Sequence, residues 1–169
     1  HGWGANLLMW RTDLVKPAPD SGGAVFDPNS PDKGKITAYD DPIYIADAAL
    51  YLKSARPDLH ITDPYELDAT QFSAVVSLLK VQHTVVGTYW SDYTKEQSAV
   101  ANADSVVGTT WQVIANLRLS DMTPSPLSVT VPKERSTGWP EPWQTSPHAA
   151  HPNPPTHRGN ATAPPPPPA

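Results

Sequence analysis

The stretch GKITAYDDPIYIADAALYLK, residues 34–53, determines the expected fold more than any other part of the chain. Its apolar run Ile36–Tyr39 is typical of a buried strand, and two aspartates and a proline follow it directly. Apolar residues then recur with the spacing of an amphipathic helix, at Ile45, Ala48, Ala49 and Leu52. A strand, an acidic turn and a helix in this order are typical of an open α/β sheet, in which ligands bind at the carboxyl ends of the strands. We therefore expect the acidic turn to face a cationic ligand.

Strand-like and helix-like segments alternate on both sides of this stretch. Asp68 stands three residues before Gln71, a variant of the capping box, and predicts the start of a second helix. The expected apolar positions of this helix are Phe72, Val75, Val76 and Leu79. Residues 2–10 suit a buried strand or a close-packed crossing. We further expect a strand at 85–89, a helix at 91–102, a strand at 105–110, a helix from 111, and a strand at 127–131 that leaves this layer. Strands that alternate with helices predict parallel pairing in an α/β fold.

The composition excludes several classes of function. The chain carries 17 acidic and 12 basic residues, for a net charge of −5, which argues against a nucleic-acid surface and favours small cations as partners. It has no cysteine, so disulfides, thiolate nucleophiles and cysteine-ligated metals are excluded. We find no Walker loop, GxSxG elbow or GxGxxG run, and the histidines at 148, 151 and 157 are irregularly spaced. These observations predict neither an enzyme nor a cofactor or metal site.

The C-terminal part has a different character from the rest. More than half of the 21 prolines lie at or after Pro132. From Thr137 onward the sequence has no periodicity, so we expect neither helix nor sheet there. The run of five prolines near the end predicts polyproline II or disorder. At the other end, the chain begins at His1 without a methionine or a signal-like segment, which is typical of an internal piece of a longer protein.

Two adjacent carboxylates, Asp40 and Asp41, are the first candidate site residues. Asp41 precedes Pro42, which favours the first position of a helix, so the simpler interpretation is a helix cap whose carboxylate accepts backbone N–H groups. The sharper interpretation is that Asp40 or Asp41 also pairs with an ammonium group in a cleft. The two roles can coexist on neighbouring residues. Adjacent carboxylates on one turn are poorly placed as the opposed acid and base of a glycosidase.

Two tryptophans are candidates for the same edge of the sheet. Trp111 stands where a strand meets a helix, and an indole ring there can contact both cations and methylene chains. Trp90 is one of three aromatic residues in the segment YWSDY, any of which could line the cleft. For each of these aromatic residues the commoner outcome is simple packing in the core.

Seven motifs in one order resemble the extracellular solute-binding proteins of ABC importers, in the spermidine/putrescine-binding branch. They are GWGANLLM, VFDP, GKITAYDDPIYIADAALYL, DPYELD, QFSAVVSLLK, YWSDY and VVGTTWQ. The resemblance implies an α/β fold like one lobe of a periplasmic binding protein, with a parallel-rich sheet flanked by helices. It also implies a monomeric receptor for polyamine-like cations, periplasmic or extracellular and in some cases lipid-anchored, that delivers its solute to a membrane ABC permease.

By position, the resemblance assigns Asp41 to the carboxylate that binds an amine and Trp111 to the tryptophan that stacks on the polyamine chain. Trp139 and Glu141 fall where the family has an aromatic residue and, two residues on, an amine-binding aspartate. Tyr44 departs from the family, because the polyamine binders commonly have glutamate three residues after the first aspartate. This departure weakens spermidine itself as the expected ligand and leaves another cation or a related neutral solute open.

The resemblance also implies that parts of the family's fold are missing. We expect residues 1–29 to form a crossing strand and connector from an incomplete first lobe, and residues 30–126 to form the second α/β lobe. Residues 127–146 are expected to return as a crossing segment, and 147–169 to form a disordered proline-rich tail. The final segment PPTHRGNATAPPPPPA resembles nothing in the family and looks like out-of-frame translation. For such a fragment we expect weak or no binding, because half of the cleft is absent.

An alternative hypothesis from a different class is an isolated α/β module that binds other proteins and has no transport role. In this hypothesis the proline tail would bind in a polyproline-recognising groove of another protein. Only the tail supports it, and the run of five prolines lacks flanking basic residues.

Overall fold

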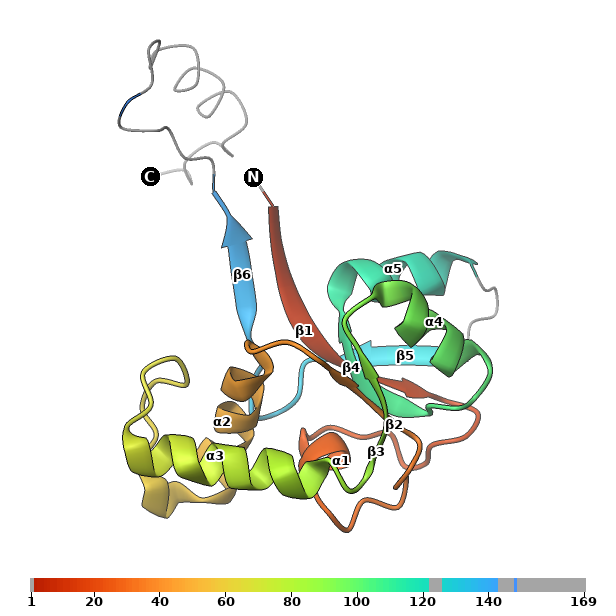
Figure 1. Cartoon of the computed structure of the whole chain (residues 1–169). Helices are drawn as coiled ribbons and strands as arrows, with labels where there is room; N and C mark the ends of the chain where they lie inside the picture. The colour runs from red at the N-terminus through yellow and green to blue at the C-terminus, as the bar shows by residue number, and fades with distance from the viewer. Residues whose placement is uncertain (1, 122–125, 143–147, 149–169) are drawn as a thin grey trace, which may run out of the picture. The chain divides into compact units, whose positions relative to one another are not determined.

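The computed structural model describes residues 2–121, 126–142 and 148, and for residues 118–121 it describes the backbone only. The chain divides into two compact units, one of residues 5–137 and one that combines residues 1–4 with 138–169 (Figure 1). Apart from His148, the expected proline-rich tail at 147–169 lies outside the described residues. No helix in the described part of the chain is long and apolar enough to cross a membrane.

Strands and helices alternate along most of the described chain. In order they are β1 (Gly2–Arg11), α1 (Gly23–Phe26), β2 (Ile36–Tyr39), α2 (Tyr44–Ala55), the 3₁₀ turn η1 (Pro57–Leu59), α3 (Ala69–Gln82), β3 (Val86–Trp90), α4 (Tyr93–Ala101), β4 (Val107–Trp111), α5 (Gln112–Asp121), β5 (Leu127–Thr130) and β6 (Gly138–Glu141). The expected strand at 36–39 is confirmed to the residue. The other expected helices and strands of the larger unit are found with boundaries shifted by one to three residues.

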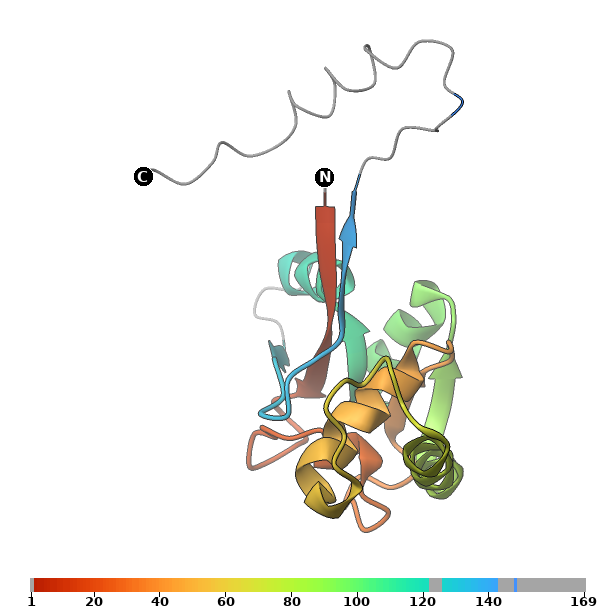
Figure 2. The same ribbon diagram turned by 90° about the vertical axis from the view of Figure 1, so that its left-hand side faces the viewer.

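The sheet is mixed rather than wholly parallel. Its strand order is β3-β2-β4-β1-β5. Strand β2 runs parallel to both β3 and β4, whereas β1 pairs antiparallel with both β4 and β5. Helices α2 and α3 lie on one side of these strands and α4 and α5 on the other, as the two views show (Figures 1 and 2). The parallel trio β3-β2-β4 therefore ends at one common edge, where the acidic turn lies.

Two expectations about the later strands are wrong. Strand β5 does not leave the layer but pairs with β1, with Leu8 opposite Thr130 and Arg11 opposite Leu127. This antiparallel ladder satisfies the backbone groups of β1 on the side away from β4. Residues 138–141 form strand β6, which pairs with β1, although no strand was expected there. Pro140 is compatible with an edge strand, because an edge has positions that need no N–H donor.

The capping box of α3 is present as expected. The Gln71 backbone N–H donates to Asp68 Oδ1 at 2.8 Å, and the Asp68 N–H donates to Gln71 Oε1 at 3.0 Å. The apolar face is rotated relative to the prediction, since Phe72 is 46 % exposed whereas Val75 is fully buried. Gln82, seven residues after Val75, also has no exposed surface.

Replacing Asp68 with alanine should lower the free energy of unfolding by about 1 kcal/mol, because the Gln71 backbone N–H loses its acceptor at the start of α3. Urea unfolding followed by circular dichroism measures the effect. Ser73→Ala is the matched control, since Ser73 is an exposed residue of the same helix, and it should change stability by less than about 0.5 kcal/mol. Equal effects of the two variants would contradict the assignment of the cap.

Strands β2 and β4 approach each other closely where they pair. Thr37 and Gly108 are Cα partners in this parallel ladder. A Cβ atom on Gly108 would collide with the carbonyl oxygen and the methyl group of Thr37. Glycine is therefore required at position 108 for β4 to reach its place beside β2.

Candidate functional site

Three aromatic rings meet where the parallel strands end. Tyr39 is the last residue of β2, Trp90 of β3 and Trp111 of β4. The Tyr39 and Trp90 ring centroids lie 4.6 Å apart, Tyr39 and Trp111 are 5.3 Å apart, and the two tryptophans are 5.4 Å apart. Both pairs that involve Trp111 are edge-to-face, an arrangement that stabilises aromatic clusters beyond simple burial. We call these three residues the aromatic trio.

The members of the aromatic trio differ in exposure. Trp90 is 1 % exposed, and its indole N–H has no hydrogen-bond partner among the described residues. Tyr39 and Trp111 are half-buried. Trp90 therefore forms the base of the trio, while Tyr39 and Trp111 present part of their surface to the solvent. Trp90 packs beneath the two other rings and is too buried to contact a large ligand itself.

The acidic turn follows the trio directly in sequence. The Asp40 backbone N–H donates to the Trp90 carbonyl at 2.8 Å, which extends the β2–β3 pairing by one residue. The Asp41 carboxylate accepts a hydrogen bond from the Ile43 N–H at 3.1 Å, and the Asp41 carbonyl accepts one from the Tyr44 N–H at 3.0 Å. The expected helix cap is wrong in position, because α2 begins at Tyr44 with Ile43 as its N-cap and no side-chain cap, so that Asp41 closes the turn before the helix instead. Both carboxylates are exposed.

An open hollow of about 330 Å³ lies beside this turn. Its lining residues come from the end of β2, the start of α2, the end of α3 and the end of β3. They are Tyr39, Asp40, Asp41, Pro42, Tyr44, Ile45, Leu79, Gln82 and Tyr89. The charged side chains in this lining are the two aspartates, and it includes no lysine, arginine or histidine. The hollow is therefore an environment that favours a positively charged group.

Gln82 contributes a buried acceptor to the lining. Its Nε2 donates to the Val25 carbonyl at 2.9 Å and to the Tyr44 hydroxyl at 3.1 Å. Because the Val25 carbonyl can only accept, this contact fixes the orientation of the amide. The Gln82 Oε1 then has no hydrogen-bond partner in the described part of the chain. An unpartnered buried carbonyl oxygen is costly, and because Gln82 has no exposed surface it belongs to the packed base of the hollow and is not a surface that a solute reaches.

Tyr44, which stands where the resemblance implies a glutamate in the polyamine binders, is buried. Only 4 % of the residue is exposed, its ring packs against Phe26 at 5.4 Å, and its hydroxyl accepts the bond from Gln82. Burial, as the largest cause, raises the pKa of its phenol well above the usual range. Tyr44 lines the hollow but brings no negative charge to it.

The other two tyrosines of the hollow also stay protonated at neutral pH. Burial, with the charge of Asp41 as the second cause, raises the pKa of Tyr39. Burial and then the charge of Asp40 raise the pKa of Tyr89, whose hydroxyl lies 3.3 Å from His83 Nδ1. Both phenols therefore remain neutral, so the negative charge of the hollow comes from Asp40 and Asp41.

Trp139 and Glu141 belong to the smaller unit, in strand β6. The Trp139 indole lies directly over Gly4, so that a Cβ atom on Gly4 would collide with it. The Glu141 carboxylate lies next to Gly2, two residues earlier on β1. The two glycines thus make room for the two β6 side chains that the sequence singled out.

Two lining residues were missed by the sequence analysis, although each carries a signal. Tyr39 is the last residue of a strand that was predicted exactly, so its side chain had to lie at the carboxyl edge. Gln82 follows Val75 by seven residues, which places it on the same face of α3. A polar residue at a core position of a helix is the signal that could have identified it. No cluster of three or more potential metal ligands occurs among the described residues.

Comparison with known proteins identifies the fold. No protein-family model matches the chain. The spermidine/putrescine ABC transporter substrate-binding protein of Streptococcus pneumoniae matches with a TM-score of 0.65 and 18 % identity, over 81 % of this chain and 38 % of that one. The TpPotD lipoprotein of Treponema pallidum matches with a TM-score of 0.64 and 12 % identity, over 82 % and 41 %. A GABA receptor matches with a TM-score of 0.55 and 21 % identity, over 76 % and 37 %.

These similarities establish an α/β fold that matches one lobe of the periplasmic binding proteins. The expected fold class is therefore confirmed, with a mixed and partly parallel sheet. The matched structures include an ABC transporter substrate-binding protein and an extracellular solute-binding protein, neither of which is an enzyme. The chain spans about two fifths of the length of the structures it matches.

Proposed function

We propose that the chain is part of a substrate-binding component of an ABC importer and that it binds a cationic, polyamine-like solute at the carboxyl edge of β2, β3 and β4. The observation that carries this proposal is a hollow next to Tyr39 of the aromatic trio, in which Asp40 and Asp41 are the charged groups among the described lining residues. The similarity to solute-binding proteins supports the receptor class, and the chemistry of the hollow supports the charge of the solute.

An alkylammonium group fits this lining for two physical reasons. Its N–H groups can donate to the exposed carboxylates of Asp40 and Asp41, and charge-assisted hydrogen bonds are the stronger kind. Its methylene chain can lie against Tyr39, whose half-buried ring lines the hollow and contacts Trp111, because aromatic faces attract cations and also pack against apolar groups. A solute that alternates ammonium and methylene groups uses both features.

The remaining parts of the proposal rest on the resemblance to the family. Trp139 and Glu141 would contribute an aromatic surface and a second carboxylate, and a membrane permease would receive the solute. The proposed location is periplasmic or extracellular. The hollow has one carboxylate cluster, and the buried Tyr44 stands where a second acid is common in the polyamine binders. A solute with a single ammonium group, such as γ-aminobutyrate, is therefore the main alternative to a polyamine.

Titration of the isotopically labelled chain with putrescine, followed by nuclear magnetic resonance, tests the proposal. The indole N–H signal of Trp111 and the backbone signals of residues 39–42 should shift with a dissociation constant in the millimolar range, because a single open wall buries little of the solute. Spermidine and γ-aminobutyrate are titrated in parallel to separate the two solute classes. The matched control ligand is 1,4-butanediol, which has the same four-carbon chain without charge and should cause no shift.

Asp41→Asn should weaken putrescine binding about tenfold or more, since it removes the charge from a charge-assisted contact. Asparagine caps helices about as well as aspartate, so the turn into α2 should persist. Asp63→Asn is the matched control, because the Asp63 carboxylate makes the same kind of contact with the Tyr65 N–H at 2.8 Å and does not line the hollow. Equal shifts with butanediol, or unchanged affinity in Asp41→Asn, would refute the proposed site.

A further inference from the structure

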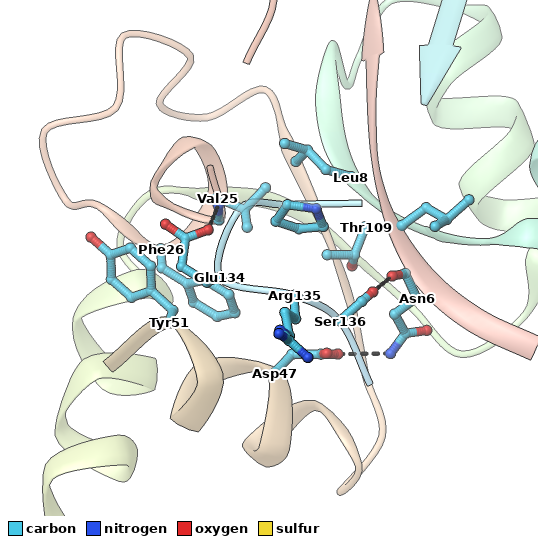
Figure 3. Close-up of a pocket in the computed structure, with 13 residues that line it drawn as sticks. Asn6, Leu8, Val25, Phe26, Asp47, Tyr51, Thr109, Glu134, Arg135 and Ser136 are labelled. Carbon is cyan, nitrogen blue, oxygen red and sulfur yellow. Dashed lines mark hydrogen bonds between the residues drawn. The ribbon is translucent and has the colours of Figure 1, made fainter. Parts of the chain in front are cut away.

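A small cavity lies in the larger unit, where the sheet, helix α2 and the segment before β6 meet (Figure 3). Its volume is about 20 Å³, which is room for about one water molecule. Much of its wall is apolar, as at Leu8, Val25 and Phe26. A wholly apolar cavity of this kind stays dry, whereas polar groups on the wall can hold a water molecule. The polar side chains on the wall therefore decide whether this cavity is hydrated.

Thr109 of β4 carries an unsatisfied hydroxyl group on this wall. The residue is 8 % exposed, and its Oγ1 has no hydrogen-bond partner among the described residues. The Tyr44 hydroxyl lies close enough to Thr109 for Thr109 to lower the Tyr44 pKa against the larger effect of burial, but the two groups do not form a hydrogen bond of normal geometry. Buried polar groups almost always have a protein or water partner, so the Thr109 hydroxyl requires one.

Asp47 of α2 lines the same cavity with a buried carboxylate, and the residue is 9 % exposed. Asn6 Nδ2 donates to its Oδ2 at 2.7 Å, the Thr137 hydroxyl donates to its Oδ1 at 2.7 Å, and the Thr137 backbone N–H donates to the same oxygen at 3.1 Å. Each carboxylate oxygen can accept two hydrogen bonds, so Oδ2 can accept one more. All three of these donors are neutral, and a buried carboxylate is costly without full hydrogen bonding.

Ser136 supplies a third polar group to the wall. Its hydroxyl donates to the Asn6 carbonyl, so the Ser136 oxygen can still accept a hydrogen bond. Glu134 also lines the cavity, but its carboxylate already accepts two hydrogen bonds from the turn before α1. The wall thus presents one hydroxyl that can donate, on Thr109, and two oxygens that can accept, on Asp47 and Ser136. A water molecule, which accepts and also donates twice, is complementary to this set.

We propose that the cavity holds one ordered water molecule, which accepts a hydrogen bond from Thr109 and donates to Asp47 Oδ2 and to Ser136. Three hydrogen bonds are typical of a buried water molecule. The cavity volume excludes a larger polar ligand. The water joins β4, two residues before Trp111 of the aromatic trio, to α2 and to the segment before β6. The proposal concerns the interior of the larger unit and is independent of the proposed solute.

Two measurements on the isotopically labelled full chain detect such a water molecule. Nuclear Overhauser cross peaks should connect water with the methyl groups of Leu8 and Val25, because both side chains line the cavity. Their sign should be that of a water molecule that stays bound for longer than the protein takes to tumble. Oxygen-17 relaxation dispersion counts long-lived water molecules and does not detect the hydroxyl groups of the protein. It therefore separates a bound water from exchange of the Thr109 and Ser136 hydroxyl protons.

Thr109→Val removes the hydroxyl with little change of shape, and Thr109→Ile also fills the cavity. Both variants should lose the water–methyl cross peaks and one long-lived water molecule, and Thr109→Val keeps the test decisive if the larger side chain prevents folding. Thr37→Val is the matched control and should keep both signals, because Thr37 is also buried with an unpartnered hydroxyl but does not line the cavity. The proposal is overturned if the unchanged chain shows neither signal, or if either Thr109 variant keeps them. It is equally overturned if Thr37→Val loses them to the same extent.

Discussion

Trp90→Ala is expected to lower the free energy of unfolding by about 3–5 kcal/mol, the range for truncating a large buried aromatic side chain. Trp90 is 1 % exposed and contacts both other members of the aromatic trio, with centroid distances of 4.6 Å to Tyr39 and 5.4 Å to Trp111. Its removal leaves a cavity under two rings that depend on it for their orientation. Urea unfolding followed by circular dichroism measures the loss.

The matched control for this prediction is Trp3→Ala. Trp3 is 73 % exposed, so its truncation should change the free energy of unfolding by less than about 0.5 kcal/mol. The comparison holds the chemical change constant and varies only the burial. If Trp90→Ala cost no more than Trp3→Ala, the aromatic trio would not form a packed base for the site, and the proposed function would lose its main support.

Gly108→Ala should destabilise the protein by about 3 kcal/mol or more, at the upper end of the range for overpacking. The added methyl group would meet the backbone carbonyl and the side-chain methyl of Thr37, its partner in the parallel ladder. Backbone atoms cannot move aside as the end of a flexible side chain can, so β2 and β4 would have to separate. Because Tyr39 and Trp111 stand at the ends of these two strands, their edge-to-face contact should weaken too.

Gly22→Ala is the control for Gly108→Ala. At Gly22 the nearest atom to an added Cβ is Phe26 Cδ2 at 3.5 Å, an ordinary contact, and the backbone is in the right-handed helical region at φ −55°. Alanine should therefore be neutral there or stabilise by a few tenths of a kcal/mol, because it restricts the unfolded chain. Urea unfolding distinguishes the two variants. A loss below about 1 kcal/mol for Gly108→Ala would show that the two strands can adjust.

Local features of the fold could be predicted from the sequence because they depend on neighbouring residues. The apolar run at 36–39 and the Asp68/Gln71 capping box each act within a few positions, and both are present as expected. The pairing of β5 with β1 could not be predicted in the same way. Strand β5 pairs with the side of β1 that is still free once β1 has paired with β4. Nothing in the sequence of residues 127–130 specifies that side.

The site was predictable in part for the same reason. The turns after β2, β3 and β4 were recognised one by one, and the parallel pairing of their strands brings Trp90 and Trp111 together. The burial of Tyr44 also had a signal, because Tyr44, Ala48 and Leu52 follow one another at intervals of four along α2. The unpartnered Gln82 carbonyl had none, since it depends on where the Val25 carbonyl lies after folding. A hydrogen bond between segments that are distant in sequence cannot be predicted from the pattern of neighbouring residues.

The start of helix α2 has one further consequence for the larger unit. Asp41 stands in the turn before the helix, and Asp47, the fourth residue of the helix, accepts hydrogen bonds from Asn6 and Thr137. The first turn of α2 therefore has an exposed hollow on one side and a buried polar contact on the other. A substitution that moves the start of this helix should disturb both at once, so the hollow and the buried contact cannot be altered independently through α2.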